Sequence, residues 1–66
     1  MGVEQKSFSS SLIDSAAYDA EKKVLTVNFL NGRSYDHQDV PPEVWAGLRD
    51  AFSAGRFWNQ MLKGRY

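Results

Sequence analysis

Apolar residues alternate with polar ones in the N-terminal half of the chain, with the spacing typical of β-strands. The clearest stretch is Val24 to Leu30, where Leu25, Val27 and Phe29 occupy every second position among β-branched neighbours. An earlier stretch, Phe8–Tyr18, mixes serine with apolar residues and predicts a first strand. The polar run between the two stretches predicts a turn.

Asn31-Gly32 directly follows the second predicted strand and is a strong hairpin signal, because both residues tolerate positive φ. We expect a third strand over Arg33–Gln38. A two-residue loop would place Tyr35 and His37 on the more polar face as an exposed platform. A three-residue loop with Gly32 in a bulge would place both rings on the core face. We favour the bulge, because it keeps the apolar residues together.

After Val40 the apolar spacing changes to three and four residues, which predicts helices. A proline opens the first helix at no hydrogen-bond cost, and we expect it to run from Pro42 to about Phe52. Its apolar stripe consists of Val44, Leu48, Ala51 and Phe52, with Trp45 beside it. Ser53 is expected to end this helix and to cap a second one over Ala54 to Lys63.

The element order is therefore β-β-β-α-α, an α+β fold in which a three-stranded antiparallel meander precedes two short helices. We expect residues 1–7 to form a flexible tail and residues 8–66 to form one domain. The chain has only 66 residues and no cysteine. Domains this short usually need some stabilisation beyond one small core, which favours a homo-oligomer.

Composition narrows the chemistry. A chain with no cysteine and one histidine holds neither a thiolate metal site nor a multi-histidine one, and we expect no metal or cofactor. Asp36 would point to the opposite face of the strand from His37, so no catalytic triad follows and we expect no enzyme. The polar start and the lack of an apolar run of about 20 residues predict no membrane contact and a cytoplasmic location.

Charge favours a small anion site over a nucleic-acid clamp. Eight basic residues balance eight acidic ones, whereas nucleic-acid binders are usually basic. From Arg49 onward, however, four basic residues face one acidic residue. Ser53 opens a helix whose amides could receive a phosphate, with Arg56 and Asn59 in the first turns. The serines at 9–11 could add hydroxyl donors. Rings for base stacking are offered by Phe57, Trp58 and Tyr66.

Several spaced motifs resemble the KTSC domain. They are the pattern SS-x-I-x-x-A-x-YD from Ser10, LTVNF-x-NG-x-x-Y-x-H from Leu25, Val40-Pro41, and S-x-G-x-FWN-x-x-L-x-x-x-Y from Ser53. This small domain is named from the C-terminal appendage of some lysyl-tRNA synthetases, and it also occurs as stand-alone bacterial and phage proteins. The resemblance implies no enzymatic activity, and RNA binding has been suggested for the family. It draws attention to Tyr35, His37, Ser53, Gly55, Phe57 and Asn59. The family's Tyr-x-Tyr reads Tyr-Asp-His here.

Two functions remain in competition. The first is a non-catalytic binding module for a phosphate-bearing ligand, either a small or cyclic nucleotide or RNA, as in a phage-type protein that sequesters a host nucleotide signal. The alternative is a protein–protein interaction module that docks through an aromatic patch anchored by Trp45 or Trp58. The candidate ligand-binding residues are Tyr35, His37, Ser53, Gly55, Arg56, Phe57, Trp58, Asn59, Arg65 and Tyr66.

Overall fold

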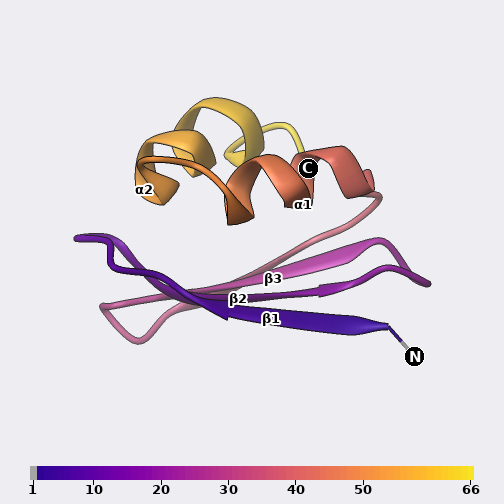
Figure 1. Cartoon of the computed structure of the whole chain (residues 1–66), viewed down its shortest axis with the longest axis horizontal. Coiled ribbons are helices and arrows are strands. Elements are labelled where there is room, and N and C mark those ends of the chain that lie inside the picture. Colours follow the sequence, from indigo (N-terminus) through magenta and orange to yellow (C-terminus); the bar gives the residue numbers. More distant parts are fainter. Residues whose placement is uncertain (1) are drawn as a thin grey trace.

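The computed structural model describes residues 2–66, which form a four-stranded antiparallel sheet with helices over one face (Figure 1). The strands follow one another in the order β1-β2-β3-β4, so the sheet is a meander. The strands are β1 Val3–Ser7, β2 Ile13–Asp19, β3 Val24–Phe29 and β4 Ser34–His37. The helical segments are α1 Pro42–Arg49, α2 Ala54–Phe57 and the π-helix η1 Trp58–Leu62.

Strand β1 corrects the predicted flexible tail, and the meander has four strands rather than three. It pairs with β2 from Val3 opposite Asp19 to Ser7 opposite Ser15. All five of its residues are exposed, so no apolar alternation marks it in the sequence. Its Glu4 side chain ties it to α1, because Trp45 Nε1 donates to one carboxylate oxygen at 2.9 Å and Arg49 Nη1 to the other at 3.2 Å.

Residues 8–12 form the connection between β1 and β2, not the first half of a strand. The cause is a local turn, in which the Ser10 hydroxyl oxygen accepts the N–H groups of Leu12 and Ile13. These backbone donors are therefore unavailable to a sheet ladder. Strand β2 begins at Ile13, where its alternating burial also begins.

The β3–β4 hairpin confirms the three-residue loop with the bulge. The N–H of Phe29 donates to the carbonyl of Arg33 at 2.8 Å, and Gly32 has a φ of 89°. A side chain at this φ would be strained, which is why glycine suits the position. The register then pairs Tyr35 with Val27 and His37 with Leu25. Both rings lie on the face that the helices cover.

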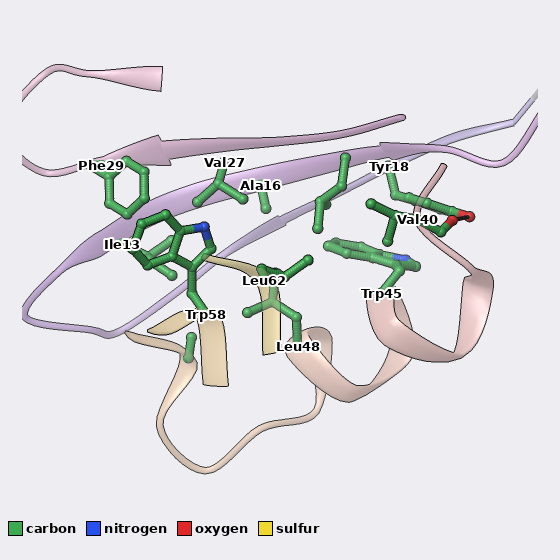
Figure 2. Packing of buried hydrophobic residues seen from close by; sticks show 12 residues of the cluster. Ile13, Ala16, Tyr18, Val27, Phe29, Val40, Trp45, Leu48, Trp58 and Leu62 are labelled. Carbon is green, nitrogen blue, oxygen red and sulfur yellow. Dashed lines mark hydrogen bonds between the residues drawn. The ribbon is translucent and has the colours of Figure 1, made fainter. Parts of the chain in front are cut away.

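The core lies between the sheet and the helices, and each end of it is built on one tryptophan (Figure 2). Trp58 packs edge-on against Phe29, with ring centroids 4.8 Å apart. At the other end, Trp45 stacks on Tyr18 at 5.8 Å. Fully buried leucines of α1 and η1 lie between the two. The hydroxyl of Tyr18 donates to the carbonyl of Val40 and so fixes the chain that enters α1.

Helix α1 ends at Arg49, earlier than predicted, and the placement of Phe52 on its buried stripe is wrong. The buried residues of α1 are Trp45 and Leu48, whereas Phe52 is fully exposed at 108%. The chain turns over residues 50–53 so that α2 can pack back against α1. A close contact supports this packing, since a Cβ at Gly47 would lie 2.6 Å from the ring of Phe57.

The second helical segment starts at Ala54 as predicted, but after Phe57 it takes π geometry to Leu62 instead of continuing as an α-helix to Lys63. Ser53 is confirmed as the N-cap, because its hydroxyl oxygen accepts the N–H of Arg56 at 3.4 Å. In the part of the chain that the structure describes, no helix is long and apolar enough to cross a bilayer.

Candidate functional site

The structure divides most of the predicted ligand residues into two groups. A ring cluster joins Tyr35, His37, Trp58 and Tyr66. A separate hollow is lined by Ser53, Gly55, Arg56 and Asn59, together with the serines of the β1–β2 connection. Two predicted residues belong to neither group: Phe57 packs on Gly47, and Arg65 is exposed near the C-terminus.

The hydrogen bonds of the ring cluster show which ring nitrogen of His37 carries the proton. Trp58 Nε1–H donates to His37 Nε2 at 3.0 Å, so this imidazole nitrogen carries no proton. The proton of the neutral ring is thereby assigned to Nδ1, which lies 3.3 Å from the main-chain oxygen of Tyr66. Both ring nitrogens of His37 are engaged, and its side chain is buried. The imidazole therefore ties β4 to η1 and to the C-terminal residue.

Trp58 offers no free face to a nucleobase, although the sequence suggested that role. The indole is buried, and Tyr35 stacks on it with centroids 6.0 Å apart and an interplanar angle of 11°. Phe29 meets the same indole edge-on, and Lys63 Nζ lies 6.0 Å from its centroid. Tyr35 stays half-exposed, because β4 is the edge strand of the sheet.

The second group lines a hollow of about 450 Å³ between the β1–β2 connection and α2. We call it the serine hollow and define it by Ser9, Ser10, Ser11, Ser53, Arg56 and Asn59. In Figure 1 the tip of the connection lies beside the start of α2. Of residues 2–66, Arg56 is the one ionisable residue that lines the hollow, and no carboxylate among them does. The lining is therefore polar and locally cationic.

Two serine hydroxyls of this hollow already accept hydrogen bonds from backbone N–H groups. Ser10 Oγ accepts from the N–H groups of Leu12 at 3.1 Å and Ile13 at 3.2 Å, and Ser53 Oγ accepts from Arg56 at 3.4 Å. A hydroxyl has one donor proton and two acceptor lone pairs. Each O–H is thus left to donate, which suits a ligand rich in acceptor oxygens.

Gly55 lets α2 approach the connection closely. A Cβ at this position would lie 3.2 Å from Leu12 Cβ and 3.6 Å from Ser10 Oγ. Gly55 has no positive φ; among residues 2–66, the glycines with positive φ are Gly32 and Gly64. Because Gly55 has no side chain, α2 and the β1–β2 connection can lie close together as the two walls of the serine hollow.

Phe52 is the residue near this hollow that sequence reasoning misplaced. Its ring is fully exposed and lines the rim of the serine hollow. The sequence contained a signal that Phe52 lies outside α1, because an N-cap at Ser53 requires the preceding helix to end before that residue. Phe52 then sits just before the cap, where an apolar residue often packs against the first turn. Here it does not pack in that way.

Comparison with known proteins gives the family. The sequence profile of the KTSC domain matches residues 9–66. The chain belongs to the KTSC domain family. A crystal structure of a KTSC domain protein from Yersinia pestis superimposes with a TM-score of 0.90 at 30% identity, and the match covers 97% of this chain and 90% of that one.

Two related sequences differ in how the KTSC domain is used. A protein of Tsukamurella paurometabola is 42% identical over 57 residues, which is 86% of this chain and 85% of the relative. A lysine–tRNA ligase of Nostoc punctiforme is 34% identical over 56 residues, which is 85% of this chain but 10% of the ligase. The KTSC domain therefore occurs both nearly alone and as a small part of an enzyme.

Among the described residues of this KTSC domain, the pKa is shifted at Glu4 on β1, at Tyr18 on β2, and at Arg49 and Asp50 at the end of α1. The pKa of the Glu4 carboxyl is lowered, first by the hydrogen bond from Trp45 and then by Arg49. The pKa of Asp50 is lowered by its hydrogen bonds with the Arg49 guanidinium. Across residues 2–66, no three histidine or acidic side chains come together as a metal site would require.

Proposed function

We propose that this KTSC domain is a non-catalytic module that binds a phosphate-bearing ligand, in the first place a small nucleotide, in the serine hollow. The observation that carries the proposal is the lining of that hollow. Hydroxyl groups that already accept backbone hydrogen bonds converge there with one guanidinium, and no carboxylate of the described residues opposes them.

The size and chemistry of the hollow suit one phosphate group with an attached nucleoside. Its volume of about 450 Å³ falls within the roughly 300–1,000 Å³ of small-molecule sites. A guanidinium matches phosphate oxygens with two parallel hydrogen bonds. Helix α2 has four residues before the π geometry begins, so the proposal does not use the charge of a helix N-terminus.

The overall charge supports a short ligand. Each phosphate contact on a long nucleic acid calls for its own cation, and this chain has no net charge. RNA stays in the set of candidate ligands, because one relative is named as a lysine–tRNA ligase. A cyclic nucleotide, and sequestration of a host nucleotide signal by a phage-type protein, also remain predictions.

The docking alternative loses the anchors that the sequence suggested for it. Trp45 and Trp58 are both buried in the core and hydrogen-bonded through their indole N–H groups. A partner protein could not bury either ring without opening the fold. Self-association stays a prediction on the grounds of chain length.

Isothermal titration of the full chain with pyrophosphate, nucleoside monophosphates, cyclic dinucleotides and a short RNA tests the proposal. Arg56→Ala should weaken binding by about ten-fold or more, because hydrogen bonds to charged groups contribute about 1.5–3 kcal/mol. Arg65→Ala is the matched control, since Arg65 is also exposed but does not line the hollow. Equal effects of the two variants, or no binding of any ligand, would refute the proposal.

A further inference from the structure

Phe52 is the one large apolar side chain of the described residues that is completely exposed. It lies in the turn between α1 and α2, and it forms no ring pair with another aromatic residue of 2–66. Single exposed apolar residues are common and carry no function by themselves. The surroundings of Phe52 are what distinguish it.

A second hollow, of about 270 Å³, also has Phe52 in its lining. We call it the Lys6 hollow and define it by Lys6, Ser7 and Arg49, which come from β1 and α1. It shares Ser9, Ser10, Phe52 and Ala54 with the serine hollow. The two hollows therefore meet along a boundary that includes the Phe52 ring.

Each hollow contains a basic residue. Arg56 in one and Lys6 in the other form no ion pair within 4.0 Å with any residue that the structure describes, although the charge of Lys6 contributes to the lowered pKa of Asp50. Arg49 is engaged by Glu4 and Asp50, both at 3.2 Å. No carboxylate lines either hollow. Two hollows that each contain a basic residue and several serines thus share the exposed Phe52 in their lining.

We propose that Phe52 is a stacking platform for a nucleobase and that the two hollows receive successive phosphates of one ligand. The ligand class is then a dinucleotide or a short single-stranded segment with at least two phosphates. This inference rests on the proposed function, since it takes the serine hollow as the first phosphate site. An aromatic ring stacks on any base, and stacking is largely independent of sequence.

Titrations of the full chain with pyrophosphate, adenosine monophosphate and the 5′-phosphorylated dinucleotide pApA separate the two claims. Phe52→Ala should weaken pApA binding by about five-fold or more, from typical base–aromatic stacking energies, and leave pyrophosphate binding unchanged. Phe52→Tyr should bind pApA like the parent. Lys6→Ala should weaken pApA more than adenosine monophosphate. Leu30→Ala, at another exposed apolar residue, should change nothing.

Each other outcome has a distinct meaning. If pyrophosphate binds through Arg56 but Phe52→Ala binds pApA like the parent, the stacking platform is overturned and the phosphate site stands. If Phe52→Ala changes the assembly state in light scattering but not pApA affinity, the ring is a contact between copies and the platform is overturned. If no phosphate compound binds, both claims fail together.

Discussion

The buried hydrogen bond between Trp58 and His37 leads to a sharp prediction about stability. Replacing His37 with leucine keeps nearly the same side-chain volume but removes the acceptor for Trp58 Nε1–H, which now lies 3.0 Å from His37 Nε2. Trp58 is buried, so its N–H would be left without a partner away from water. We expect the His37→Leu variant to fold but to be less stable than the parent.

The magnitude follows from the cost of one unsatisfied buried donor, which is about 1–3 kcal/mol. For a domain of this size each kcal/mol lowers the melting temperature by roughly 4–8 °C, so a loss of about 2 kcal/mol predicts a decrease of roughly 8–16 °C. The neighbouring Gln38 is exposed and provides the control. Gln38→Leu should stay within about 0.5 kcal/mol of the parent.

Urea denaturation of a double-mutant cycle with Trp58→Phe measures the contact itself. In the Trp58→Phe background no indole N–H remains to be stranded, so His37→Leu should cost much less there than in the parent. Replacing both partners of a buried hydrogen bond by apolar groups is often nearly neutral with respect to that bond. An equal loss in both backgrounds would refute the reasoning, because the effect would then come from packing alone.

Three further predictions concern the parts of the fold that position the site. The pKa of Glu4 in the folded protein lies below its ordinary value of 4.5, so the ionised carboxylate stabilises the fold above pH 4.5. This stabilisation is lost as the pH falls through the folded pKa. Glu4→Gln should therefore flatten the pH dependence of the free energy of urea unfolding between about pH 3 and 6. Burial raises the pKa of Tyr18 above 10.0, so the stability that this group contributes should be lost as pH rises above 10. This fall in stability should be smaller in Tyr18→Phe, and an alkaline profile unchanged by the substitution would contradict the prediction. Gly32→Ala, at a φ of 89°, should cost about 1–2 kcal/mol in the same assay, and an unaltered midpoint would argue against the bulged turn.

The hairpin and the helix cap could be predicted from the sequence because their signals are local. The alternation in β3 and the Asn-Gly pair at its end locate the hairpin, and the need to keep apolar residues together favours the three-residue loop whose register places Tyr35 and His37 on the core face. Ser53 caps α2 by accepting the N–H of Arg56, three residues later, so this cap depends only on a short stretch of sequence. Because the cap fixes the start of the helix, the sequence predicted that Arg56 and Asn59 lie in its first turns, and both residues line the serine hollow.

The remaining features depend on contacts between distant residues. Strand β1 has one apolar residue, and it is tied to α1 by Glu4 through a hydrogen bond to a tryptophan 41 positions away. No pattern of neighbouring residues in the sequence indicates such a contact. Aromatic residues were the other difficulty, because a ring suits a core and a base-stacking surface equally well. Burial alone shows that Trp58 belongs to the core and that Phe52 is exposed.

Amide chemical-shift mapping by NMR during titration of the full chain with pyrophosphate tests the central claim most directly. The account predicts that the largest shifts occur at Ser10, Ser53 and Arg56, around the serine hollow, and that the amides of Tyr35 and Tyr66 in the ring cluster stay unchanged. Shifts centred on Tyr35 and Tyr66, or no saturable shifts at all, would contradict it.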